Sequence, residues 1–294
     1  MVDAALTVIV AVENSSENIK AVLEALDPPK NPMVQFVFGF AGASDNLPAY
    51  ADKWANVDTL IVPAGCRIPH IWAEGIRQSR AKYVGLLTGQ FVPREDWVAR
   101  ALALPWPESR AGYGGVISNN ARARAMDWGI FILRYCRFSP PLSATVVEDI
   151  AADNSVYRRD LILEEESLLA NGFWEPAFHT RFRRRGFDLA LDPELAAEQH
   201  NRFSARDFAS QRYQHAIEFG RERAETKSTT WIFMMLLLAP LLPGVFFAKV
   251  LAVATGSQHC RRHVFSSIPW IMFFLICWGS GEARGYFKAL RRSN

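Results

Sequence analysis

The stretch AKYVGLLTGQFVPREDWV, residues 81–98, decides the fold class. Its first half holds a short apolar run over 83–87, which predicts a buried strand. Pro93 ends this run, and Trp97 begins a segment with helical periodicity. In α/β proteins, ligands commonly bind at the carboxyl end of such a strand. The residues at that position carry no charge: they are Thr88, Gly89 and Gln90.

Strands and helices alternate on both sides of this stretch. The apolar runs LTVIVAV and VQFVFGF are typical of strands that are covered on both faces. The predicted strands are 6–12, 34–40, 59–63, 83–87 and 112–118. A helix starting after Ser15 or Ser16 is predicted by Ile19, Val22, Leu23 and Leu26, and a second helix by residues 69–80. Since strand–helix–strand units favour right-handed crossovers, we expect an α/β fold with a mostly parallel sheet flanked by helices.

Composition narrows the class of protein. The chain has 294 residues, enough for one sizeable core and a smaller part, and its net charge of +3 gives no indication of a nucleic-acid partner. Its four cysteines are scattered without the spacing of a metal site, so reduced cysteines in a cytoplasmic domain are the expectation. They are Cys66, Cys136, Cys260 and Cys277.

The C-terminal part is strongly apolar. Residues 229–255 contain one charged side chain, Lys249, and residues 264–280 contain none. A bilayer-spanning helix needs about 20 apolar residues, so membrane association is favoured over a pair of buried core helices. Arg261 and Arg262 separate the two runs, and Pro240 and Pro243 interrupt the first. Spanning helices are therefore favoured, with a re-entrant or interfacial arrangement as the alternative.

These observations predict two domains, an α/β domain over 1–226 and a membrane-associated helical tail over 227–294. Residues 205–226 read as a solvated helix leading to the tail. Residues 124–138 form a helical pattern with arginines among large apolar side chains. That pattern fits either a half-buried helix or a helix at the membrane surface beneath an acceptor lipid.

Several segments together carry a resemblance to a known family. They include ENSSENIKAVLEAL, GIRQSRAKYVGLL followed by FVPREDW, ADNSVYRRDLI, FWEPAFHTRFRRRGFDLALDP, EQH, and WGSGEARGYFKAL. In their order and spacing, the chain resembles inverting family 2 glycosyltransferases of the GT-A fold. The nearest type is the membrane-associated bacterial enzyme that builds exopolysaccharides or glycolipids. The resemblance implies a sugar-nucleotide donor, a lipid-linked or glycan acceptor, and a catalytic domain on the cytoplasmic side of the inner membrane.

The resemblance also implies roles for individual residues. Glu175 lies eleven residues before Gly186, where the family places its general base. Arg181 on the same helix is expected at the donor phosphates, and His200 is a candidate metal or phosphate ligand. The implied acceptor-binding residues are Asn154, Tyr157, Arg158 and Arg159.

This sequence departs from the family pattern at the donor. The family ends its second strand with Asp residues that hold the nucleotide, whereas this chain has Ala41, and its nearest carboxylate is Asp45. The family's Asp-x-Asp motif, which holds Mg²⁺ or Mn²⁺, is replaced by Thr88-Gly89-Gln90. Thr and Gln can donate hydrogen bonds to phosphate, but they bind hard cations less well than carboxylates do.

Three interpretations follow from this departure. The chain is a metal-independent transferase in which Arg158, Arg159 or Arg181 neutralises the leaving group, or it uses a lipid-phosphate sugar as donor. Alternatively, it is an inactive glycosyltransferase-like scaffold or subunit of a membrane polysaccharide assembly complex. Because the segment from Asn154 to Arg159 is retained together with Glu175 and the basic helix, we favour an active, inverting hexosyltransferase-type enzyme.

Overall fold

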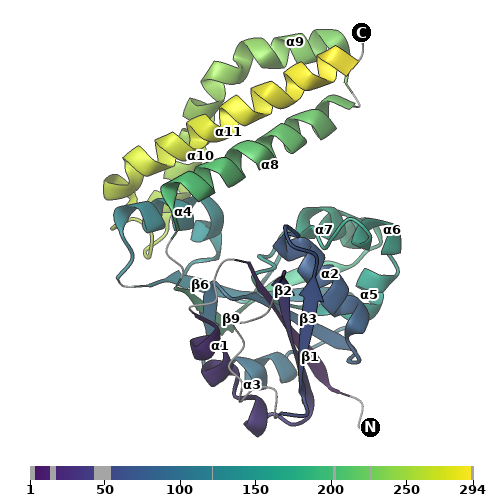
Figure 1. Cartoon of the computed structure of the whole chain (residues 1–294). Helices are drawn as coiled ribbons and strands as arrows, with labels where there is room; N and C mark the ends of the chain where they lie inside the picture. The colour runs from purple at the N-terminus through teal and green to yellow at the C-terminus, as the bar shows by residue number, and fades with distance from the viewer. Residues whose placement is uncertain are drawn as a thin grey trace. The chain divides into compact units, whose positions relative to one another are not determined.

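The structure is a computed structural model that describes residues 4–13, 18–42, 54–120, 122–200, 203–225 and 227–292 (Figure 1). The chain divides into two compact units. The sheet unit comprises residues 1–120 and 138–201, and the helical unit comprises residues 121–137 and 202–294. This division differs from the boundary at residue 226 that the sequence predicts, because the helical unit also includes α4 (Ala125–Tyr135) and α8 (Ala205–Glu225).

In the described part of the chain, nine strands form the sheet of the first unit. The strand order is β3-β2-β1-β4-β8-β6-β9-β5, and β7 pairs with β9. The strands are β1 (Leu6–Val12), β2 (Val34–Ala41), β3 (Val57–Val62), β4 (Tyr83–Thr88), β5 (Phe91–Pro93), β6 (Arg110–Asn119), β7 (Thr145–Val147), β8 (Asn154–Arg158) and β9 (Asp188–Gln199).

The α/β architecture confirms the expectation from sequence. The four strands at one end of the strand order, β3-β2-β1-β4, are parallel to one another, and β6 and β9 are also a parallel pair. The remaining pairs are antiparallel: β8 lies antiparallel between β4 and β6, and β9 pairs antiparallel with β5 and β7. The sheet is therefore mixed, with a parallel half formed by the N-terminal strands.

Helices cover both faces of the sheet (Figure 1). They are α1 (Ile19–Leu26), the 3₁₀ turn η2 (Pro28–Lys30), α2 (Ile68–Gln78), α3 (Trp97–Leu102), α5 (Arg159–Leu163), α6 (Glu166–Leu169) and α7 (Glu175–Arg184). Alternate residues of β1 point to opposite faces: Val8 and Val10 belong to the core under α1 and α3, whereas Ile9 packs beneath α2. Gly75 permits this second contact, since a Cβ there would lie 2.6 Å from Cγ2 of Ile9.

The helical unit consists of long helices. After α4, the 3₁₀ turn η4 (Cys136–Phe138) returns the chain toward the sheet unit. The remaining elements of the helical unit are α8, α9 (Thr229–Leu238), the 3₁₀ turn η5 (Ala239–Leu241), α10 (Leu242–Gly256) and α11 (Val264–Arg292). Within the described residues, the stretches Thr229–Gly256 and Val264–Leu290 are long and apolar enough to cross a membrane, by length and composition only.

Helices α8 and α11 run in the same direction and touch along much of their length. Phe208 packs edge-to-face on Phe274, with 4.7 Å between ring centroids, near the start of α8. Two glycines on α11 then bring the backbones together, because a Cβ on Gly281 or Gly285 would lie 2.4 Å from a carbonyl oxygen of α8. The WGSGEARGY segment thus forms a close helix–helix contact.

A buried carboxylate lies within the same contact. Glu282, which is 1% exposed, accepts hydrogen bonds from the hydroxyl of Tyr286 at 2.6 Å and from the indole of Trp278 at 3.2 Å. Arg223 on α8 forms an ion pair with it at 3.5 Å. Since each oxygen has a donor, these contacts account for a carboxylate inside an otherwise apolar helix.

Candidate active site

The carboxyl ends of several strands meet at one edge of the sheet. Strands β1, β4, β6 and β9 all point toward this edge, and β8 starts there, with Asn154 opposite Leu87 of β4. The edge therefore brings together the end of β4 at Thr88, the end of β6 at Asn119 and the end of β9 at Gln199. This is the position where ligands bind in open α/β sheets.

The Thr88-Gly89-Gln90 loop is tied to its neighbours through its backbone. The amide of Gly89 donates to the carbonyl of Ala11 at 2.9 Å, and the amide of Gln90 donates to Oγ1 of the fully buried Thr88 at 3.3 Å. The carbonyl of Gln90 accepts from the amide of His200 at 2.9 Å. The loop is thus held between β1 and the end of β9. Its remaining polar side chain is that of Gln90.

Two buried glutamines at this edge have side-chain amide atoms without a hydrogen-bond partner among the described residues. Oε1 of Gln90 and both Oε1 and Nε2 of Gln199 are enclosed and unbonded among the described residues, although the two side chains are only 8% and 1% exposed. They lie close together, because Gln199 pairs with Phe91, the residue after Gln90. Buried amides without partners are rare in folded proteins, and a ligand that is absent here is one explanation for them.

Beside this pair, His200 contacts a carboxylate. Its Nε2 lies 2.8 Å from Oε1 of Glu198, which also accepts from the side chain of Asn120 at 3.0 Å. His200 and Glu198 together supply two potential metal ligands.

Asn154 is a structural anchor under the same edge. It is fully buried, accepts from the indole of Trp97 at 2.7 Å, and donates to the carbonyls of Val116 and Leu195, both at 2.9 Å. Gly115 makes room for it, since a Cβ there would lie 2.4 Å from its Nδ2. Its side chain is therefore occupied by the protein, and contact with an acceptor stays a prediction.

A buried chain of polar side chains links β8, α7 and the segment after β7. The hydroxyl of Tyr157 is hydrogen-bonded to Nε2 of His179 at 2.9 Å, and Nδ1 of His179 lies 3.1 Å from a carboxylate oxygen of Asp149. Because an ionised carboxylate only accepts, the neutral imidazole carries its proton on Nδ1, and Nε2 accepts from Tyr157. Both Tyr157 and His179 are 0% exposed.

Glu175 is the first residue of α7, and Pro176 follows it in the first turn. A carboxylate is favoured there by the helix dipole, and proline by its missing N–H. Glu175 is half-buried and lies near the polar chain: burial, and next the charge of Glu175, raise the pKa of the Tyr157 hydroxyl well above its ordinary value. The predicted base thus lies within electrostatic reach of the buried Tyr157 hydroxyl, which is linked through His179 to the half-buried Asp149.

The arginines with predicted site roles make other contacts. Arg158 forms an ion pair with Asp160 at 2.6 Å, and Arg159 donates to the carbonyls of Ile76 and Arg77. Arg181 lies 3.7 Å from Glu165 and is half-exposed. A role for them in neutralising a leaving group stays a prediction, and it would require them to exchange these partners.

The other predicted donor residues lie on β2 and beyond it. Ala41 ends β2 and is half-buried, whereas Asp45 lies outside the described residues. In the described ranges, no group of three or more His, Cys, Asp or Glu side chains is arranged to hold a metal ion. The donor set at the end of β4, a threonine and a glutamine, does not fit a hard divalent cation either.

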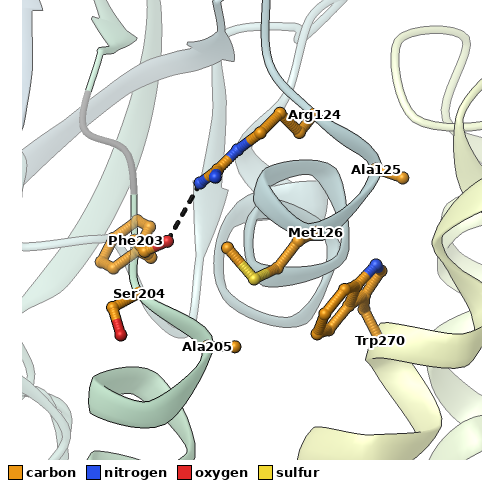
Figure 2. A pocket seen from close by; sticks show the side chains of 7 residues that line it. All are labelled: Arg124, Ala125, Met126, Phe203, Ser204, Ala205 and Trp270. Carbon is orange, nitrogen blue, oxygen red and sulfur yellow. Dashed lines mark hydrogen bonds between the residues drawn. The ribbon is translucent and has the colours of Figure 1, made fainter.

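The helical unit contains a separate pocket of about 390 Å³ (Figure 2). Its apolar wall is formed by α4, the start of α8 and α11, with Met126 and Trp270 facing the space. At the rim, Arg124 donates to the carbonyl of Phe203 at 3.0 Å and to the carboxylate of Asp127 at 2.8 and 2.9 Å. The pocket thus has apolar walls and one guanidinium, whose hydrogen bonds go to Asp127 and Phe203.

Comparison with known proteins places the fold. No protein-family model and no curated protein sequence matches this chain. Among solved structures, the chain is similar to the mannosyltransferase PcManGT from Pyrobaculum calidifontis, in complex with GDP-Man and Mn²⁺ (TM-score 0.54, 14% identity, 98% of this chain and 88% of that one). It is also similar to S. aureus TarS 1–349, in complex with UDP (TM-score 0.51, 12% identity, 99% and 92%). The chain therefore has a GT-A-like glycosyltransferase fold.

The sequence does not predict the polar contacts of Tyr157 near the proposed base, because neither His179 nor Asp149 stands out in it as a candidate site residue. A usable signal was present, because His179 follows Glu175 by one helical turn, on the same face of α7. The part played by Gln199 carries no such signal, since it depends on the pairing of β9 with β5 and β6.

Proposed function

We propose that this protein transfers a sugar, with inversion, from a nucleotide-sugar donor to a lipid-linked or other membrane-proximal acceptor. The observation that carries the proposal is the position of Glu175: it starts α7, is half-buried, and lies within electrostatic reach of the buried Tyr157, which is linked through His179 to Asp149. The GT-A-like fold supports it, since the two similar structures hold GDP-Man and UDP.

In this proposal the reaction is a single displacement. Glu175 accepts the proton of the acceptor hydroxyl, and the acceptor oxygen bonds to the anomeric carbon from the face opposite the leaving group. The bond from that carbon to the diphosphate breaks, and the nucleoside diphosphate leaves with the electron pair. The buried Tyr157 hydroxyl is expected to stay protonated, so that it orients the site without exchanging a proton.

The donor diphosphate is assigned to the carboxyl edge of the sheet. The buried amides of Gln90 and Gln199 supply uncharged hydrogen-bonding groups there, which suits phosphate oxygens and ribose hydroxyls better than a metal ion. This supports donor binding without a divalent cation. In this proposal the catalytic domain lies on the cytoplasmic side of the inner membrane, in keeping with four cysteines that are scattered along the sequence.

The test is release of nucleotide from UDP-, GDP- and dTDP-sugars by the full-length protein in membranes, with and without a chelator. The matched variants are Glu175→Gln and Glu166→Gln, because Glu166 also begins a helix but pairs with Arg77 at the surface. We expect release that resists the chelator, falls by at least a hundredfold in Glu175→Gln, and is unchanged in Glu166→Gln. Release that is indifferent to Glu175, or absent with every donor, contradicts the proposal.

The alternative of an inactive scaffold has one observation in its favour, the absence of carboxylates at the end of β4. It predicts binding of a ligand or partner with no turnover. Equilibrium binding of UDP and GDP separates the two: nucleotide binding without release from any sugar nucleotide indicates the scaffold.

A further inference from the structure

One side of the helical unit is an exposed apolar surface. On α9 and η5, large side chains are open to the surroundings, among them Phe233 at 67%, Leu237 at 80% and Leu241 at 62%. The surface continues along α10 and the outer side of α11. The further residues are Met234, Leu238, Val245, Val253, Phe265, Phe273 and Ile276. So many exposed large apolar side chains on neighbouring helices mark an interaction site.

The opposite side of the same unit is polar. In Figure 1, α11 lies between α8 and α9, so α8 forms the other outer layer. Its inner face packs on α11 through Phe208, Ala216 and Ile217. Most of its exposed side chains are polar or charged, among them Asp207, Gln214 and Glu218, and Phe219, at 43% exposed, is an apolar exception.

This layering conflicts with helices that span a bilayer. From Phe208 to Arg223, α8 follows α11 over about 22 Å, most of the ~30 Å hydrocarbon thickness. If α11 crossed the membrane, the charged outer face of α8 would enter the hydrocarbon beside it, which is costly. If α11 instead lies in the membrane plane, α8 faces water while α9 and α10 face lipid.

The connection between α10 and α11 leads to the same conclusion. His263, just before α11, stacks on Trp128 of α4 with 3.8 Å between ring centroids, and His259 lies 5.1 Å from the same ring. The chain enters α4 from a strand of the sheet unit and returns to that unit directly after it. The turn therefore lies on the same side of a bilayer as the sheet unit, and the segment that leads into α9 lies there too if α8 stays in water.

The charges around the apolar surface have one sign. From Lys227 to the C-terminus, Glu282 is the only acidic residue in the sequence, and it is buried. The exposed charged residues along the described part of this segment are Lys227, Lys249, Arg261, Arg262, Arg284 and Lys288. Basic residues bordering an apolar face complement an anionic lipid surface.

We propose that the helical unit is a monotopic membrane module, embedded in one leaflet of an anionic bilayer by the face formed by α9, α10 and the outer side of α11. The segment from α9 to α11 then begins and ends on the same side of the bilayer as the sheet unit, and so does the turn between α10 and α11. Helix α8 remains in water. The monotopic arrangement rests on the membrane association that the proposed function includes, but it does not depend on whether the protein is catalytically active.

The test uses the full-length protein made by cell-free synthesis in the presence of preformed vesicles of phosphatidylethanolamine and phosphatidylglycerol. Single cysteines are placed at Glu95→Cys in the sheet unit, Lys227→Cys before α9, and Gln258→Cys in the turn, in a background without native cysteines. All three positions are exposed. We expect a membrane-impermeant maleimide to label all three from outside to the same extent. Labelling of position 258 only after the vesicles are permeabilised shows a spanning hairpin and overturns the proposal.

A second measurement needs no substitution. Trypsin added outside the vesicles is expected to cut the wild-type chain at Arg261 or Arg262 to the same extent as in detergent; protection until detergent is added overturns the proposal. In flotation assays, Arg261→Gln and Arg262→Gln are expected to weaken binding to anionic vesicles about fivefold each, with Lys20→Gln on α1 as the control. Failure to bind vesicles at all refutes both the module and the membrane-proximal acceptor, whereas nucleotide release in detergent still tests sugar transfer.

Discussion

The side chains of Tyr157 and His179 meet inside the sheet unit, with 2.9 Å between the tyrosine hydroxyl and Nε2 of the imidazole. One residue comes from the middle of the sheet and the other from α7, so the contact fastens the helix that carries Glu175 to β8. Asp149 holds the other side of the ring at 3.1 Å. The position of the proposed base thus depends on a buried polar contact that itself is not exposed to substrate.

Replacing Tyr157 with phenylalanine is expected to destabilise the protein. The ring contacts remain, but Nε2 of His179 stays buried without its partner, which costs about 1–3 kcal/mol. Thermal unfolding of the full-length protein in detergent measures the change. Tyr83→Phe is the control, because its ring stacks on Trp106 at 4.2 Å and the stacking survives the substitution. Equal Tm values for Tyr157→Phe and wild type would show that the hydrogen bond contributes little.

Replacing Gln199 with methionine is expected to stabilise the protein while impairing donor binding. Methionine has a similar shape and removes two buried amide atoms that lack partners, so a gain of up to about 1 kcal/mol is expected. Gln35→Met is the matched control, since the amide of Gln35 is bonded to Thr7 and Asp58 at 2.9 and 2.7 Å and its loss should destabilise. A lower Tm for Gln199→Met, with nucleotide affinity retained, would contradict the assignment of this edge to the donor.

Adding one methyl group at Gly285 is expected to separate α8 from α11. Its Cβ would lie 2.4 Å from the carbonyl oxygen of Ile217, and overpacking of this kind costs about 1–3 kcal/mol. Gly244→Ala provides the control, because a Cβ there meets nothing within 4 Å and the substitution raises helix propensity. The Tm measured by thermal unfolding should therefore fall in Gly285→Ala and rise in Gly244→Ala. A stabilised Gly285→Ala protein would mean that the two helices are not in contact.

Acidification is expected to weaken the packing of His263 on Trp128. Burial, and next the charge of Arg262, lower the pKa of His263 from its ordinary value of 6.5. The unfolded chain therefore takes up a proton at a higher pH than the folded one, so the stabilisation is present above pH 6.5 and is lost as the pH falls below it. The difference in Tm between about pH 7.5 and pH 5.5 should be smaller in His263→Phe, which keeps the stacked ring but cannot titrate. An unchanged difference would assign the pH dependence to other groups.

The sequence predicts the elements whose signals are local. The strand over 6–12 is found at Leu6–Val12, and the helix inferred from Ile19 to Leu26 is α1, with its four periodic residues buried. The N-cap expected at Ser15 or Ser16 lies outside the described residues. Proline and glycine also place the ends of β4 and α2 to within two residues.

Long-range pairings were not predictable in the same way. The antiparallel position of β8 between β4 and β6 depends on contacts between segments far apart in the chain, for which apolar periodicity carries no information. The same holds for α4: its half-apolar pattern was recognised, but its partners on α11 were not. In the candidate site, the spacing of the sequence predicts Glu175, whereas the amide oxygen of Gln90 and the amide group of Gln199 are seen to be buried without partners only in the structure.

The insertion of α4 into the helical unit has a consequence for biosynthesis. Trp128, Ile130 and Phe131 leave the ribosome long before His263 and the rest of α11 have been translated. Until the last helix emerges, the apolar face of α4 lacks its native covering, while most of the sheet around it can already form. We therefore expect nascent chains to need chaperone protection at this helix. For the same reason, a chain ending at residue 226 should aggregate, although it contains every strand of the sheet.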